Sequence, residues 1–146
     1  MGFVDEVRRV YPFFPLIAGR VRRPFTWQGH DFPVGRRVLL DIYGTDHDAR
    51  LWPEPEVFRP ERFRDWAGDR YTLIPQGGGD DRDEHRCPGE PMTRLLTAEA
   101  VRLLTRSMRY DVGVQDLSVS LSQLPALPRS GFVVHGVQPV AAAAAD

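Results

Sequence analysis

Lysine is absent from this sequence, and cysteine occurs once. All 19 basic residues are arginine, which by itself indicates no function. Cys87 is the only cysteine. A single cysteine excludes a disulfide within the chain, a zinc site made only of cysteines, and an iron–sulfur cluster held by several thiolates of this chain.

Long apolar runs are absent too. There is no run of about 18 apolar residues, so we expect no membrane span. Residues 1–9 have no apolar core of the kind found in signal peptides. The net charge of -1 gives no reason to expect binding to nucleic acid or to an anionic membrane surface. We therefore expect a cytoplasmic protein with neither nucleic acid nor membrane as a partner.

The composition is typical of one soluble globular domain. The chain has 146 residues, of which 42% are hydrophobic and 27% charged. The 13 glycines and 13 prolines indicate many turns and irregular segments. We expect the domain to span residues 1–139, and an Ala-rich tail at residues 140–146 to be disordered.

Hydrophobic periodicity predicts a mixed α+β fold. Residues 4–10 have helical spacing with no N-cap residue before them, as though the chain began inside a longer helix. Strands are predicted at residues 25–28 and 37–41, joined as a hairpin or meander. A short helix is predicted at residues 45–50, with Asp46 as its cap. Two later strands are predicted at residues 110–114 and 131–137.

The clearest predicted element is one long helix at about residues 89–108. Pro88 suits its first turn, and Glu90 suits the positive end of the helix dipole. Before it, residues 53–88 are rich in proline, glycine and charge, and their aromatic side chains argue against disorder. The apolar side chains that recur at i, i+3 and i+4 in the helix are Met92, Leu95, Leu96, Ala100, Leu103, Leu104 and Met108.

Cys87 carries the chemistry that the sequence indicates. It lies just before the long helix, where unpaired N–H groups and the helix dipole favour a thiolate. A thiolate binds a soft metal or a haem iron. The glycines at residues 77–79 allow unusual dihedrals and let a flat, bulky partner approach the backbone. His85 and Arg86 carry side chains suited to binding carboxylates.

Other interpretations of these residues remain open at this point. A lone cysteine is most often a small buried hydrophobe. Cys87 as a nucleophile with His85 as its base is disfavoured, because residues two apart rarely aim their side chains at each other. The glycine triplet is most often a flexible turn, and the acidic cluster at residues 80–84 is most often solvated surface.

Glu6 and Arg9 form a second candidate cluster. They are three positions apart on a predicted helix, so their side chains are neighbours. If exposed, such a pair contributes little to stability. Arg62 lies in the segment at residues 58–63, which proline stiffens and aromatic residues flank. A buried Glu6 between Arg9 and Arg62 would lock this segment onto the first helix.

Taken together, the motifs resemble those of a cytochrome P-450, a haem-thiolate protein. Glu6-x-x-Arg9, the segment at residues 58–63, and a Gly-rich loop that ends His85-x-Cys87-x-Gly89 occur in the family's order and spacing. The resemblance covers about residues 3–138. Segments similar to the bacterial fatty-acid peroxygenase branch lie at residues 11–15, 41–48, 74–79 and 124–128.

The resemblance implies a role for each matching residue. Cys87 would be the axial thiolate ligand of the iron of haem b, and His85 would face a haem propionate. Phe13 would face the haem and substrate cavity. The structural triad behind the haem would be Glu6, Arg9 and Arg62. The residues that cross the proximal haem face would be Gln76, Gly77, Gly78 and Gly79, with Gln76 where most members have phenylalanine.

The fold that the resemblance implies is the C-terminal, haem-ligand portion of the mostly helical P-450 fold. A whole member of this branch would hydroxylate or decarboxylate long-chain fatty acids with hydrogen peroxide, and would need no reductase. The distal helix and its carboxylate-binding arginine have no counterpart in this chain. We therefore expect a fragment that is inactive alone. A non-catalytic haem-binding module and a non-functional remnant are the alternatives.

Overall fold

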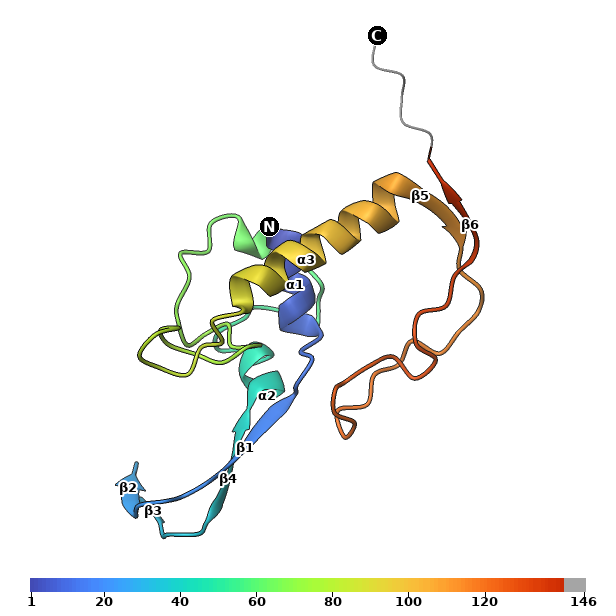
Figure 1. Ribbon diagram of the computed structural model, residues 1–146. Coiled ribbons are helices and arrows are strands. Elements are labelled where there is room, and N and C mark those ends of the chain that lie inside the picture. Colours follow the sequence, from blue (N-terminus) through green and yellow to red (C-terminus); the bar gives the residue numbers. More distant parts are fainter. Residues whose placement is uncertain (141–146) are drawn as a thin grey trace.

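The computed structural model describes residues 1–140, so residues 141–146 of the predicted tail lie outside the described residues. Figure 1 shows α1 (Gly2–Val10) against α3 (Glu90–Arg102) at the centre, with two extended arms leading away from them. One arm carries the first four strands, and the other is the C-terminal part of the chain. The architecture is α+β, with two-stranded antiparallel sheets and one long helix, as the sequence predicts.

Two strand pairs form the first arm. β1 (Leu16–Arg20) pairs with β4 (Arg37–Asp41), and β2 (Phe25–Trp27) pairs with β3 (His30–Phe32), both antiparallel. The predicted hairpin between residues 25–28 and 37–41 is therefore wrong.

The turn after β2 explains this difference. Gln28 and Gly29 both have positive φ, 48° and 78°, as a two-residue type I′ turn requires. The chain therefore reverses at once, and β3 takes the pairing edge of β2. β4 pairs instead with β1, a strand that the sequence did not predict.

α2 (Ile42–Asp46) begins earlier than predicted. The Asp41 side chain accepts the N–H of Gly44 at 2.7 Å, which makes Asp41 the N-cap. The predicted helix at residues 45–50 with Asp46 as its cap is wrong, because Asp46 ends the helix and is buried.

The long helix has its regular part in α3 and ends in a π-helical turn, η2 (Leu103–Ser107). β5 (Met108–Asp111) follows directly and pairs with β6 (His135–Pro139), so both strands are displaced from the predicted ranges. The segment before α3 contains one short 3₁₀ helix, η1 (Pro60–Phe63). None of the helices within residues 1–140 combines the length and apolar character needed to span a membrane.

The core is small and mixes charged with apolar side chains. α1 buries a charged face, and the long helix leaves the apolar side chains of Met92, Leu95 and Leu96 about 60% exposed. Buried charged side chains are therefore as numerous in the core as buried apolar ones. The buried hydrophobic residues are Val4, Val21, Ile42, Trp52, Leu73 and Ile74, and the buried charged residues are Asp5, Glu6, Arg8, Arg9, Asp46 and Glu90.

Candidate functional site

Glu6 lies between two guanidinium groups in a fully buried position. Arg9 donates to its two carboxylate oxygens at 2.8 and 2.9 Å, and Arg62 donates to Oε1 at 3.1 Å. The main-chain N–H of Arg59 donates to Oε1 at 2.7 Å. Burial opposes the ionisation of Glu6, but these hydrogen bonds and the guanidinium charges hold its pKa below the usual range. The three predicted triad residues are thus in contact. The exposed-pair interpretation is wrong, since Glu6 and Arg9 are 0% exposed.

The triad fastens the irregular segment after α2 to α1. Arg9 Nη1 donates to the main-chain oxygen of Asp46 at 2.8 Å. Arg62 donates to the main-chain oxygens of Pro53 and Val57 at 2.9 and 3.0 Å. These charge-assisted contacts hold a segment with little regular structure at one place relative to α1.

Cys87 lies just before α3, and its thiol is exposed. Its N–H donates to the main-chain oxygen of Gln76 at 2.8 Å, and its carbonyl accepts the N–H of Glu90 at 3.1 Å. The backbone is therefore held on both sides while the sulfur stays accessible. The exposure rules out the interpretation of Cys87 as a buried hydrophobe.

The loop at residues 77–79 needs glycine because other parts of the chain lie too close for a side chain. Gly77 and Gly79 have positive φ, 89° and 84°. A Cβ on Gly77 would collide with the main-chain oxygen of His85, and one on Gly78 would lie 3.2 Å from the Ile74 side chain. The loop therefore packs tightly against the segment that leads to the cysteine.

His85 and the acidic cluster lie on the surface. His85 is exposed, and within residues 1–140 no hydrogen bond joins its ring to the Cys87 sulfur. The interpretation of the pair as nucleophile and base therefore lacks geometric support. In the acidic cluster, the Asp80 carboxylate pairs with Arg70 at 2.9 Å and Glu84 is exposed, as expected for solvated surface.

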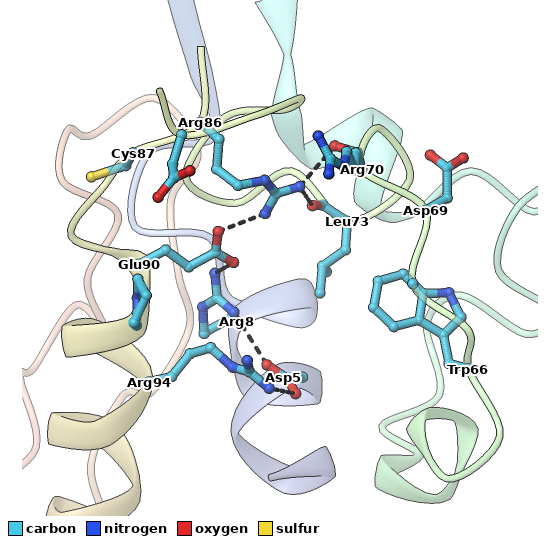
Figure 2. A pocket seen from close by; sticks show the side chains of 13 residues that line it. Asp5, Arg8, Trp66, Asp69, Arg70, Leu73, Arg86, Cys87, Glu90 and Arg94 are labelled. Atoms are coloured by element: carbon cyan, nitrogen blue, oxygen red, sulfur yellow. Dashed lines mark hydrogen bonds and ion pairs between the residues drawn. The ribbon is translucent and has the colours of Figure 1, made fainter. Parts of the chain in front are cut away.

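Phe13 and Gln76 line one groove of about 430 Å³ between α1 and α3. Phe13 is 54% exposed. The Gln76 side chain is held at both ends, because its oxygen accepts from Arg8 at 3.2 Å and its nitrogen donates to Thr93 at 3.1 Å. Cys87 lines a different, charged hollow of about 310 Å³ (Figure 2). The structure thus brings Phe13 and Gln76 together in one groove. It places Cys87 on the neighbouring surface.

Arg8, Arg86 and Glu90 form a largely buried cluster that sequence reasoning missed (Figure 2). The Glu90 carboxylate pairs with Arg8, and with Arg86 at 2.5 Å. Arg8 and Arg94 both pair with Asp5, at 3.2 and 2.7 Å. Burial opposes the ionisation of Glu90, but Arg86 and Arg8 hold its pKa below the usual range. The available signal was the spacing of Asp5 and Arg8, a second acid–base pair three positions apart on the first helix.

These residues fit a haem bound through Cys87. The thiol is exposed on a fixed backbone at the positive end of a helix, which suits a thiolate ligand. The exposed ring of Phe13 and its groove offer apolar contacts to a flat ring. Within residues 1–140, no group of three or more His, Cys, Asp or Glu side chains could hold a metal ion by itself.

Comparisons with known proteins show the family of the chain. The family model described as Cytochrome P450 matches residues 2–107. The (+)-menthofuran synthase of Mentha piperita is 31% identical over 140 residues, which is 92% of this chain and 27% of that protein. Cytochrome P450 4A11 of Homo sapiens is 36% identical over 105 residues, which is 69% of this chain and 20% of that protein.

Solved structures are more similar still. Cytochrome P450SP alpha (CYP152B1) in complex with (R)-ibuprophen is 53% identical with a TM-score of 0.86, and covers 94% of this chain and 34% of its own. Cytochrome P450EX alpha (CYP152N1) with myristic acid is 46% identical with a TM-score of 0.86, and covers 95% and 34%. A variant of cytochrome P450 OleT in complex with arachidonic acid is 44% identical with a TM-score of 0.84, and covers 97% and 34%.

The predicted resemblance is thereby confirmed, in its branch as well as its family. The chain spans about a third of the length of these structures and about a quarter or less of the curated relatives. Its structural neighbours include two cytochromes P450 of the CYP152 group, and two of the solved structures are complexes with a fatty acid. The chain belongs to the cytochrome P450 family, whose members bind haem b through a cysteine thiolate.

Proposed function

We propose that this chain forms the haem-ligating part of a fatty-acid peroxygenase, which oxidises a long-chain fatty acid with hydrogen peroxide and needs no reductase. The observation that carries the proposal is the exposed thiol of Cys87, on a backbone fixed at the positive end of α3. The solved structures with myristic acid and arachidonic acid support fatty acids as the substrate class. A cytoplasmic location stays a prediction.

Each residue of the site has a role under this proposal. Cys87 would supply the sulfur that binds the haem iron, and the N-terminal amides of α3 would stabilise the negative charge on that sulfur. His85, exposed on the same loop, would donate to a carboxylate at the rim of the ring. Phe13 would supply an apolar wall that excludes water. When bound, the haem supplies the oxidising chemistry, and the protein supplies the ligand and the orientation.

The triad has a mechanical role in the proposal. Glu6, Arg9 and Arg62 hold the segment after α2 against α1, and so support the ligand loop (residues 76–87), which leads to and includes Cys87. A rigid support of this kind keeps a ligand within the narrow range of positions that binding requires.

Turnover needs more of the fold than the described residues contain. Leu95 and Leu96 of α3 are 61% and 63% exposed, an apolar face of the kind that a folded protein normally covers. The solved relatives are about three times as long as the part that this chain matches. We therefore propose that the chain alone binds haem but does not oxidise fatty acids.

The first experiment tests haem ligation. Haem is added to the purified chain, and the absorbance spectrum of the ferrous carbon-monoxide complex is recorded. A strongly red-shifted Soret band is expected, because a thiolate opposite carbon monoxide produces it. An ordinary Soret band, or no haem uptake, would contradict the proposal.

The second experiment tests the substrate. The chain is fused to the part of cytochrome P450SP alpha that it does not match, and myristic acid and hydrogen peroxide are added. Mass spectrometry is expected to detect an oxidised acid with the fusion protein and none with the chain alone. A fusion protein with the red-shifted band that gives no product would refute the fatty-acid proposal.

The same experiments separate a second candidate, a haem-binding module without turnover. The exposure of Cys87 on the short chain favours it, because the thiol is open to a haem without further protein. This candidate predicts the red-shifted band with the chain alone, and an inactive fusion protein.

A further inference from the structure

We propose that Arg86 is a positioning residue for Cys87, and that Glu90 and Arg8 hold Arg86 in place. The proposal rests on the proposed function, because it concerns the direction in which Cys87 presents its sulfur to a haem iron. Arg86, Glu90 and Arg8 would form a second cluster of ion pairs besides the triad, and this cluster contacts the ligand loop directly.

All three nitrogens of the Arg86 guanidinium donate hydrogen bonds within the chain. Nε donates to the main-chain oxygen of Gly79 at 2.9 Å, Nη1 to Glu90 at 2.5 Å, and Nη2 to the main-chain oxygen of Arg70 at 2.7 Å. The group is planar and rigid, so these contacts fix its position relative to three segments of the chain. Because Arg86 directly precedes Cys87, they also restrict the shared peptide and the position of the cysteine.

Glu90 joins Arg86 to α1. One carboxylate oxygen accepts from Arg86 and the other from Arg8, and the Glu90 side chain is 11% exposed. A carboxylate buried to this extent is unfavourable without partners, so losing either guanidinium leaves an uncompensated charge. Both ion pairs are therefore needed to keep the arrangement in place.

Gln76 also contacts Cys87, through a main-chain hydrogen bond. Arg8 donates to its side-chain oxygen at 3.2 Å, and Thr93 accepts from its side-chain nitrogen at 3.1 Å. The main-chain oxygen of Gln76 accepts the N–H of Cys87 at 2.8 Å. Arg8 thus acts on the cysteine by two routes, one through Gln76 and one through the ion pairs.

Figure 2 shows that the cluster lies behind the cysteine. Arg86, Glu90 and Arg8 extend toward one another, whereas the sulfur of Cys87 points away from them. The hollow that they line contains four arginines and four acidic residues, so its charges balance. This balance favours an internal support over a site for an anion.

The first test needs no haem. Amide hydrogen exchange is measured by NMR on the full chain without haem, for the original sequence and for Arg86→Met, Arg86→Lys and Glu90→Gln. The amides of Cys87 and Gly79 are expected to exchange about tenfold faster, or more, in Arg86→Met and Glu90→Gln, because charge-assisted hydrogen bonds are lost. Arg86→Lys, which keeps the positive charge, is expected to be intermediate.

The matched control is Glu99→Gln, which removes an exposed ion pair with Arg102 on the same helix. It is expected to leave the exchange of both loop amides unchanged. Unchanged exchange of the Cys87 amide in Arg86→Met would overturn the proposal. Equally faster exchange in β5 and β6 for both Arg86→Met and Arg86→Lys would overturn it too, because that pattern reports general unfolding.

The second test adds haem and records the ferrous carbon-monoxide spectrum. Arg86→Met is expected to lose part of the red-shifted band, and Arg86→Lys to regain some of it, while Glu99→Gln matches the original sequence. Faster exchange with an unaltered spectrum would overturn the positioning role. If the original chain lacks the red-shifted band, the proposed function fails, and the exchange data alone decide whether Arg86 fixes the cysteine backbone.

Discussion

Arg9 and Asp46 are joined by a hydrogen bond of 2.8 Å, which runs from Arg9 Nη1 to the main-chain oxygen of Asp46. The side chain of Asp46 accepts the N–H of Ile74 at 2.9 Å. The main-chain oxygen of Ile74 in turn accepts the N–H of Gly77 at 3.0 Å. Asp46 therefore links the triad to the loop that leads to the cysteine, and its protonation state affects that link.

Stability is expected to fall as pH rises from about 4 to about 7, because of Asp46. Burial raises its pKa to about 7, although the N–H of Ile74 and the charges of Arg9, Arg8 and Arg86 oppose the rise. The neutral carboxyl group is favoured in the folded state, so its contribution is complete at low pH and is lost as pH rises through about 7. The loss is at most about 4 kcal/mol. Urea unfolding from about pH 4 to about pH 8 measures it.

Asp46→Asn is expected to flatten this pH dependence, because the amide accepts the same hydrogen bond and carries no charge. Asp48→Asn is the control, since its neighbour Arg50 holds the Asp48 pKa well below neutrality. Asp48→Asn should show the same fall in stability with rising pH as the original sequence. If stability still falls with rising pH in Asp46→Asn, another titrating group causes the fall.

Glu6→Gln is expected to destabilise the chain by about 3–5 kcal/mol, because it leaves the buried charges of Arg9 and Arg62 without their partner. The free energy of unfolding in urea measures the change. Glu99→Gln, on an exposed pair, should show no measurable change. Equal effects of the two substitutions would count against a buried triad.

Gly77→Ala is expected to disrupt the ligand loop, since a Cβ there meets the main-chain oxygen of His85. Gly35→Ala is the matched control, because Gly35 has a similar φ of 84° but nothing within 4 Å of the added Cβ. The control isolates the backbone strain, about 1–3 kcal/mol. Gly77→Ala should cost more in urea unfolding, and equal costs would show that the loop is not closely packed.

The double substitution Leu95→Gln and Leu96→Gln is expected to reduce self-association of the chain, because it removes apolar area from the exposed face of α3. Analytical ultracentrifugation over a range of concentrations measures the effect. Leu127→Gln, at an exposed leucine of the C-terminal arm, should change it less. If the double substitution leaves self-association unchanged, the surface through which the chains associate lies elsewhere.

The sequence predicts features that depend on local spacing. Glu6 and Arg9 are three apart on a helix, and α3 follows from the recurrence of its apolar residues, so both could be predicted. The pairing of Arg8 with Glu90 could not, because the two residues are 82 positions apart and no local pattern joins them. The roles assigned to the single site residues stay predictions.

The strand pairing of β1 with β4 was missed for a related reason. The choice between partners depended on the turn at Gln28 and Gly29, where the positive φ of Gln28 is unusual for a residue other than glycine. The same limit applies to α2. Asp41 and Asp46 are equally good cap residues by type, and only the structure shows which side chain accepts the N–H that caps the helix.

The substitution Cys87→Ser tests the central claim most directly. Haem is added to both proteins, and the absorbance of the ferrous carbon-monoxide complexes is compared at equal haem content, with Ser107→Ala as a control for handling. We expect the strongly red-shifted Soret band with the original chain and with the control, and its complete loss with Cys87→Ser. Identical spectra for all three proteins would contradict the assignment of Cys87 as the iron ligand.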